Sequence, residues 1–148
     1  MSKKKLRDIE LFIVDIFVAI QKIKEYTEKF TSEEDLRYSS LHWDATIREL
    51  EIIGEALNNL LDDDYFCSLS LEYFRKIVNF RNVVAHGYFG IDASEVWNIV
   101  NDKLDILLVD MVEIIKDKID LTEAIESQIE DYGKLRDIRI VKYLRLFL

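Results

Sequence analysis

The chain has 148 residues, of which 49% are hydrophobic and 33% are charged, as expected for one soluble globular domain with a sizeable core. It contains no proline, only four glycines and a single cysteine, Cys67, which excludes an internal disulfide and a cysteine-based metal cluster and favours long helices in a reducing cytoplasm. The net charge of −9 argues against broad binding of nucleic acid, so any RNA site must be a local feature.

The first part of the sequence predicts two amphipathic helices, over residues 5–30 and 42–61, joined by a polar connection at 31–40. The first helix carries an apolar seam with alternating spacings of three and four, a pattern typical of helix packing. That seam consists of Leu6, Ile9, Ile13, Ile16, Ile20 and Ile23. The face of the second helix consists of Trp43, Ile47, Leu50, Ile53, Leu57 and Leu60.

Gly54 in the middle of the second helix needs a reason, because glycine there costs roughly 1 kcal/mol relative to alanine. We expect a neighbouring helix to approach closely at this residue. Arg48, Glu51 and Glu55 follow one another at intervals of three and four residues on one face, which indicates pairing within the helix. Three aspartates at 62–64 then end the helix or begin a loop.

Two further helices are predicted between residues 70 and about 115. The third covers about 70–86 and is followed by Gly87, placed like a C-terminal cap. Asp92 followed by Glu95 resembles a capping box and opens the fourth helix. The apolar face of that helix consists of Val96, Val100, Leu104, Leu107, Met111 and Ile114.

Residues 121–148 predict a helical tail, with a break at Gly133. An apolar stripe lies beside the basic residues of this tail and favours packing over RNA binding. It consists of Leu135, Ile138, Val141, Leu144 and Leu148. The predicted fold is therefore all-α: an antiparallel helical bundle over residues 1–119, and a helical extension over 120–148 that packs on the bundle or on a partner.

The segment from Arg81 to Tyr88 is the candidate for chemistry, because the chain offers no cysteine cluster and no glycine-rich phosphate loop. An arginine five residues before a histidine is weak evidence alone, and Arg37 and His42 repeat that spacing. Their segment lies in a polar connection, whereas the segment of Arg81 and His86 ends an apolar helix at a cap. We therefore favour the second pair.

The favoured segment resembles the motif of the HEPN superfamily, in which an arginine, a polar residue and a short spacer precede a histidine. Its HepT branch extends this to Arg-x4-His-x-Tyr, matched by Arg81, His86 and Tyr88. Family members often carry aspartate where this chain has Gly87. The stretch REL-EIIGEA around Gly54 is also similar, and the resemblance covers about residues 5–115. It implies a HEPN-type bundle and an endoribonuclease toxin of a type II or type VII-like toxin–antitoxin pair.

These residue types can cleave RNA without a cofactor or a metal. A histidine that titrates near neutral pH can deprotonate a ribose 2′-hydroxyl or protonate the leaving oxygen. Arg81 can stabilise the extra negative charge on the pentacoordinate phosphate. Asn82 is a candidate for orienting the scissile phosphate or the imidazole of His86. The expected products carry a 2′,3′-cyclic phosphate and a 5′-hydroxyl.

The spacing also predicts a homodimer. Five residues at about 100° each put His86 roughly 140° around the helix from Arg81. A two-fold dimer would line one cleft with two Arg–His sets, and the resemblance implies such an arrangement. The first-helix seam and Gly54 are candidates for the dimer interface, although a core within one chain explains them equally well.

Tyr88 and the partners are also implied by the resemblance. In the HepT family, the matching tyrosine is adenylylated by MntA, a nucleotidyltransferase antitoxin, which would bring negative charge where RNA phosphate must bind. The alternative is that Tyr88 only packs over the helix end. The substrate would be an RNA, such as a tRNA or an mRNA.

A different class of function stays open at this point. A non-catalytic HEPN binding module could pair with a nucleotidyltransferase and regulate it, although such a module would have less reason to keep both Arg81 and His86. A membrane protein is excluded, since acidic residues interrupt the apolar run of residues 1–20 and no uncharged apolar stretch reaches 18 residues. The expected location is the cytoplasm.

Overall fold

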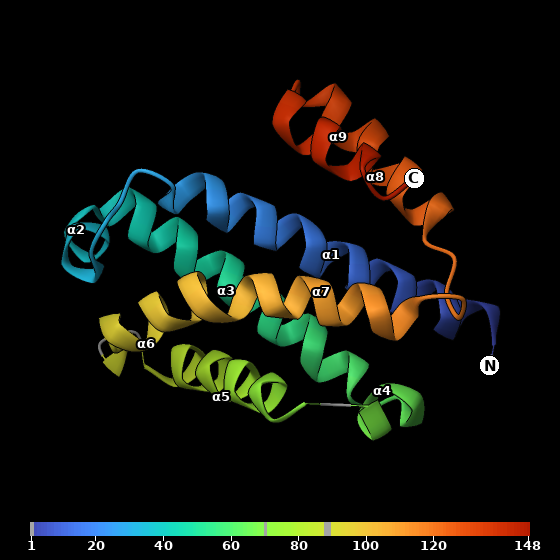
Figure 1. Ribbon diagram of the computed structural model, residues 1–148, viewed down its shortest axis with the longest axis horizontal. Helices are drawn as coiled ribbons and strands as arrows, with labels where there is room; N and C mark the ends of the chain where they lie inside the picture. Colours follow the sequence, from blue (N-terminus) through green and yellow to red (C-terminus); the bar gives the residue numbers. More distant parts are fainter. Residues whose placement is uncertain (1, 70, 88–89) are drawn as a thin grey trace.

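The computed structural model describes residues 2–69, 71–87 and 90–148, and these residues form an all-α bundle, as predicted (Figure 1). Helices α1, α3, α5 and α7 alternate in direction, which confirms the antiparallel arrangement. The elements are α1 (Lys3–Thr27), α2 (Glu33–Tyr38), α3 (Ser40–Leu60), α4 (Asp64–Leu69), α5 (Glu72–His86), α6 (Ala93–Asn98), a π-helical segment (Ile99–Lys103), α7 (Leu104–Ile115), α8 (Thr122–Lys134) and α9 (Ile138–Arg145).

The core lies where α1 and α3 pack along their lengths, with α7 against α1 and α5 against α3. Five of the six predicted seam residues of α1, from Ile9 to Ile23, are at most 4% exposed, while Leu6 at the end of the seam is 38% exposed. The face of α3 predicted from its spacing is also buried. Because neighbouring helices of the same chain cover these side chains, the seam forms the core of one chain and not a dimer interface.

The predicted connection at 31–40 is partly wrong, because it contains α2. The Ser32 hydroxyl accepts a hydrogen bond from the Asp35 amide at 3.1 Å, and three acidic residues occupy the first turn, where they favour the helix N-terminus. Leu36 is fully buried and anchors this short helix. Likewise, α4 begins at Asp64, the last of the three aspartates, and Asp63 accepts a hydrogen bond from the Tyr65 amide at 3.0 Å at its start.

The predicted fourth helix begins where expected but is not one regular α-helix. The Asp92 carboxylate caps it by accepting the Ser94 amide at 2.8 Å, which confirms the start. The chain then passes through the π-helical segment before α7 begins. The Asn101 side chain donates to the Trp97 carbonyl oxygen at 2.9 Å in this stretch.

The tail folds as two helices that lie against α1 on the side away from α5 (Figure 1). The break follows Lys134 rather than Gly133, with Arg136 at a φ of 59°. Arg139 forms ion pairs with Glu25 at 2.9 Å and Glu28 at 3.1 Å. The Phe147 ring stacks on Phe17 of α1 at a centroid distance of 4.6 Å.

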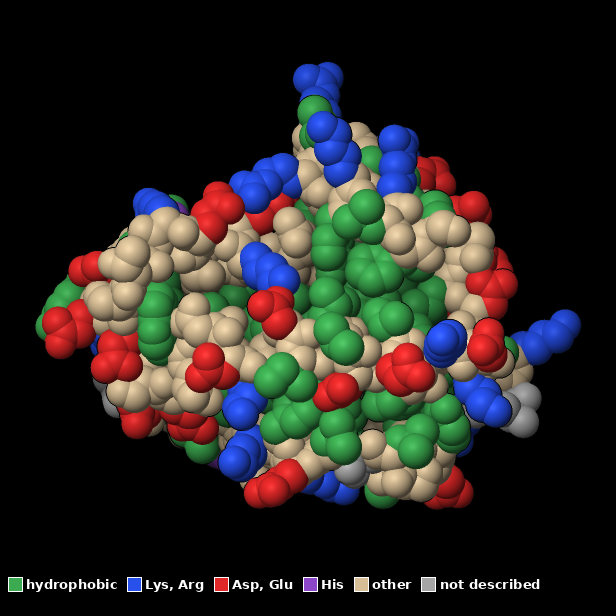
Figure 2. Space-filling view, viewed as in Figure 1, with side chains coloured by type: hydrophobic (Ala, Val, Ile, Leu, Met, Phe, Trp, Pro, Cys, Tyr) green, Lys and Arg blue, Asp and Glu red, His purple; other side chains and the backbone are tan. Residues whose placement is uncertain are grey.

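The apolar stripe predicted for the tail is mostly wrong. Leu135 and Ile138 are 73% and 65% exposed, and the buried residues of α9 are Ile140 and Leu144. Leu135 lies in the break before α9, and the face that α9 buries is centred on Ile140 and Leu144 and not on Ile138. Figure 2 shows apolar side chains gathered over the space between α7 and the tail. No helix in the described part of the chain has the length and apolarity to span a membrane.

Candidate active site

Arg81 lies on the face of α5 that packs against α3, and Gly54 makes its position possible. A Cβ on residue 54 would overlap the Cβ of Arg81, and it would lie 3.0 Å from the Arg81 Cγ and 3.3 Å from the Ile77 carbonyl oxygen. Any larger residue would push α5 away from α3. The close approach expected at Gly54 is therefore confirmed, and the neighbour is the predicted catalytic arginine of the same chain.

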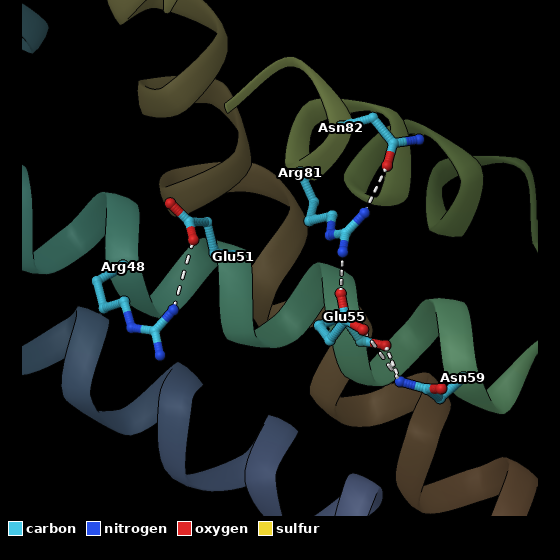
Figure 3. A network of polar contacts seen from close by, with 6 residues as sticks. All are labelled: Arg48, Glu51, Glu55, Asn59, Arg81 and Asn82. Carbon is cyan, nitrogen blue, oxygen red and sulfur yellow. Dashed lines mark hydrogen bonds and ion pairs between the residues drawn. The ribbon is translucent and has the colours of Figure 1, made fainter. Parts of the chain in front are cut away.

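The Arg81 guanidinium is held from two sides (Figure 3). Its Nη2 forms an ion pair with the Glu55 carboxylate on α3, and its Nη1 donates to the Asn82 Oδ1 at 2.9 Å. The Asn59 Nδ2 also donates a long hydrogen bond of 3.5 Å to the Glu55 carboxylate. Asn82 thus contacts the guanidinium and not the imidazole of His86, and its predicted role toward a phosphate stays a prediction.

The sequence did not predict the ion pair between Glu55 and Arg81. The spacing suggested that Glu55 pairs with Arg48, but in the structure only Glu51 does so, with 3.5 Å between Arg48 Nη1 and Glu51 Oε2 (Figure 3). Glu55 pairs instead with Arg81 on another helix. The sequence did offer one signal for this contact, because Glu55 follows Gly54 directly. A helix that approaches a glycine closely also comes near the residue next to it.

Arg81 lies at an open cavity of about 420 Å³ between α1, α3 and α5. The cavity mixes acidic, basic and apolar groups, and Asp15 at its edge remains accessible to solvent. Partial burial against the neighbouring helices still raises the pKa of the Asp15 carboxyl. The lining residues are Phe12, Asp15, Arg48, Glu51, Ile52, Glu55, Ala56, Arg81 and Ala85.

His86 is the last residue of α5, and it does not line this cavity. Its side chain is exposed, and within the described ranges no hydrogen bond or ion pair joins it to Arg81. One chain therefore leaves the predicted catalytic pair apart, as the helical spacing implied. Tyr88 lies outside the described residues.

Gly87 ends α5 in a different way from the expected cap. Its φ of −176° is extended and not left-handed, and its amide donates to the Val83 carbonyl oxygen at 3.0 Å. The helix end itself was predicted correctly, since His86 is its last residue. The missing left-handed turn means that no special backbone conformation requires glycine here.

The solvent-exposed face of α5 is basic and polar, in contrast to the net charge of −9 of the chain. One acidic residue, Glu72, lies at its start, and His86 lies at its end. Such a face suits a local approach of RNA phosphates. Its other members, at helical spacing, are Arg75, Lys76, Asn79, Asn82 and Val83.

The potential metal ligands are dispersed: within the ranges that the structure describes, no group of three or more histidine, cysteine, aspartate or glutamate residues could together hold a metal ion.

Comparison with known proteins gives one consistent family. The profile of the family described as "Ribonuclease HepT-like" matches residues 16–115. This range ends at the last residue of α7. A Methanocaldococcus jannaschii protein named "Putative RNase MJ0127" is 32% identical over 75% of this chain and 90% of its own length. Another from the same organism, named "Putative RNase MJ1380", is 33% identical over 69% of this chain and 89% of its own.

A third relative, from Thermococcus cleftensis, is named "Probable ribonuclease HepT". It is 35% identical over 63% of this chain and 83% of its own length. No solved structure matches the chain significantly.

Proposed function

Because this chain belongs to the HepT-like ribonuclease family, we propose that it is an endoribonuclease that uses Arg81 and His86 as its catalytic pair. The observation that carries this proposal is the state of α5. Its last residue is an exposed histidine with no partner among the described residues, and five residues earlier an arginine is fixed at an open cavity.

The chemistry follows from the two side chains. The His86 imidazole removes the proton from a ribose 2′-hydroxyl, and the resulting oxygen attacks the adjacent phosphorus. The Arg81 guanidinium donates hydrogen bonds to the phosphate oxygens as negative charge grows there. The bond from phosphorus to the 5′-oxygen breaks, and this oxygen takes a proton from the imidazolium or from water, giving a 2′,3′-cyclic phosphate and a 5′-hydroxyl. These steps need no metal ion.

The ion pair between Arg81 and Glu55 is compatible with this role. The Glu55 side chain is 51% exposed and the Arg81 side chain is 31% exposed, so the pair contributes at most about 1 kcal/mol. An RNA phosphate can therefore share or displace Glu55. In the absence of RNA, the contact with Glu55 and the packing against Gly54 hold the guanidinium in one orientation.

We propose that the working site forms between two copies of the chain. In one copy Arg81 faces the cavity, while His86 lies on the exposed face of α5, so a second copy is needed to supply the missing group. A two-fold axis near the C-terminal end of α5 would bring the His86 of one protomer toward the Arg81 of its partner. Val83, a hydrophobic residue that is 46% exposed beside Asn82, is suited to burial there.

Mixing inactive variants tests both parts of this proposal. Purified native protein should cut RNA in the presence of a chelator and leave 2′,3′-cyclic phosphate ends, and Arg81→Ala and His86→Ala should each be inactive. A mixture of the two variants should regain part of the activity, because a mixed dimer keeps one arginine and one histidine in the shared cleft. A site within one chain would give no recovery, and intact RNA with the native protein would favour a non-catalytic binding module.

We also propose that the protein is the toxin of a toxin–antitoxin pair, as the family resemblance implies. The partner would be an MntA-like nucleotidyltransferase that modifies Tyr88. The phenol oxygen of Tyr88 would attack the α-phosphorus of ATP, release pyrophosphate and lose its proton. The added phosphate lies two residues from His86, where it would repel RNA.

Mass spectrometry of the intact protein detects the modification. Co-expression with an MntA-like nucleotidyltransferase should add AMP units to the native chain and restore bacterial growth, whereas Tyr88→Phe should stay unmodified and toxic. An unmodified native chain would contradict this part and leave the nuclease proposal intact.

A further inference from the structure

The cavity beside Arg81 has the wrong charge for a second phosphate. Three carboxylates, from Asp15, Glu51 and Glu55, face two guanidinium groups, from Arg48 and Arg81. Glu55 is paired with Arg81 and Glu51 with Arg48, so each arginine is already neutralised. The negative charge that remains in the cavity is that of the Asp15 carboxylate. An anion is disfavoured there, and a neutral ligand with hydrogen-bond donors is favoured.

Asp15 is the group in the cavity that lacks a partner. It forms no hydrogen bond and no ion pair with any other residue that the structure describes. The neighbouring helices displace part of its water, and burial accordingly raises the pKa of its carboxyl. A carboxylate has two acceptor oxygens and no donor, so it binds a ligand that offers donors side by side.

The cavity also supplies an apolar wall. Phe12 and Ile52 are partly buried and pack against the core, and Ala56 and Ala85 complete the wall. An aromatic ring beside polar acceptors is the usual environment of an unstacked RNA base, which stacks on the ring and is hydrogen-bonded along its edge. The volume of about 420 Å³ is within the roughly 300–1,000 Å³ range of small-ligand sites.

We propose that this cavity is a nucleobase subsite that selects guanine, with Phe12 as the stacking platform and Asp15 as the acceptor for the guanine edge. This inference rests on the proposed function, since a phosphate held by Arg81 puts the attached nucleotide within reach of the cavity. Guanine presents its N1–H and one N2–H next to each other, and these donors match the two oxygens of a carboxylate. Uracil presents one N–H between two carbonyl oxygens, and the carboxylates of the cavity repel these oxygens.

Cleavage of a matched set of oligonucleotides tests the subsite. Each substrate is an oligouridine with one internal adenosine, cytidine, guanosine or inosine, and inosine lacks the 2-amino group of guanosine. The native protein should cut beside guanosine at least about 100-fold faster than at uridine alone, because each of the two hydrogen bonds to a charged acceptor contributes about tenfold or more. Inosine should fall between these rates.

Variants assign the preference to residues. Asp15→Asn replaces one acceptor oxygen by a donor, so the ratio of the guanosine rate to the uridine rate should fall at least about tenfold. Phe12→Leu keeps an apolar side chain but removes the ring, and should weaken binding of the guanosine oligomer roughly 5- to 100-fold. Asp8→Asn, on the same helix but outside the cavity, is the matched control and should leave the ratio unchanged.

Binding of non-cleavable oligomers with 2′-deoxynucleotides separates this inference from the nuclease proposal. Tighter binding of the guanine-containing oligomer that depends on Asp15, without cleavage of any RNA, would support the subsite and overturn the nuclease. Cleavage with equal rates at all bases, or a guanine preference that survives Asp15→Asn, would overturn the subsite and leave the nuclease standing. Thermal unfolding of the variants confirms that each is folded.

Discussion

The chain contains the same spacing twice, Arg37 with His42 and Arg81 with His86, and the two segments have different surroundings. In the first, the His42 Nδ1 lies 2.8 Å from the Ser39 hydroxyl, and the His42 ring makes a T-shaped contact with Phe30. Arg37 lies over the Trp43 ring at 5.1 Å. Both side chains of the first segment are engaged in contacts that hold α2 and the start of α3 together.

In the second segment the histidine is exposed at a helix end, and the arginine is held by Glu55 and Asn82 at an open cavity. Arg81 is fixed by exposed contacts above a cavity, and His86 has no partner among the residues that the structure describes. The spacing of two residue types therefore does not define a site. What distinguishes the segments is that the fold engages the ring of His42 and leaves that of His86 exposed, and that Arg81 lines an open cavity.

The largest difference in cleavage rate should be that between variants of the two histidines. His86→Ala should lower the rate of RNA cleavage by about 10²–10⁴-fold, because general acid–base catalysis is lost. His42→Ala, the matched change, should keep the cleavage rate, since its contacts are structural. Rates measured on one labelled RNA check both variants. Equal losses from the two changes would remove the functional distinction between the segments.

The arginines should differ by nearly as much. Arg81→Ala should reduce cleavage by about 10²–10³-fold, the cost of removing a donor to transition-state charge. Arg81→Lys should recover only part of this loss, because an ammonium lacks the planar fork of donors. Single-turnover kinetics with each variant is the measurement. Full activity of Arg81→Lys would show that a simple positive charge is enough.

The packing that fixes Arg81 should have an intermediate effect. Gly54→Ala places a methyl group into the Arg81 side chain and the Ile77 carbonyl, and forcing the two helices apart should cost about 1–3 kcal/mol of unfolding free energy. Activity should fall as well, since the guanidinium is displaced. Gly133→Ala is a control in open space. A more stable Gly54→Ala protein, as helix propensity alone predicts, would contradict the close packing seen here.

The smallest effect is expected for the first arginine. Arg37→Ala should lower the free energy of unfolding by about 0.5–1 kcal/mol, the usual contribution of an exposed cation–π contact with Trp43. RNA cleavage should be unchanged. Chemical denaturation of the native and variant proteins measures the difference. A variant that loses cleavage without losing stability would assign Arg37 a functional role as well.

The helices were predictable because their signals are local. Apolar residues at spacings of three and four located α1 and α3, and the Asp92 cap located the start of α6. Errors arose where a few residues decide the structure. The cap by Ser32 creates α2 inside a polar stretch, and the break after Lys134 changes which face of the tail is buried. The division into a bundle at 1–119 and an extension at 120–148 stays a prediction.

The sequence by itself determined that the protein is helical, which segments form the main helices, and that the segment with Arg81 and His86 ends a helix. These properties depend on neighbours within two turns of one helix. Only the tertiary structure decided that Glu55 pairs with Arg81, that Gly54 makes room for that arginine, and that Phe12 and Asp15 share a cavity with it. Such contacts join helices that are far apart in sequence, and their geometry depends on the distance and angle at which whole helices pack.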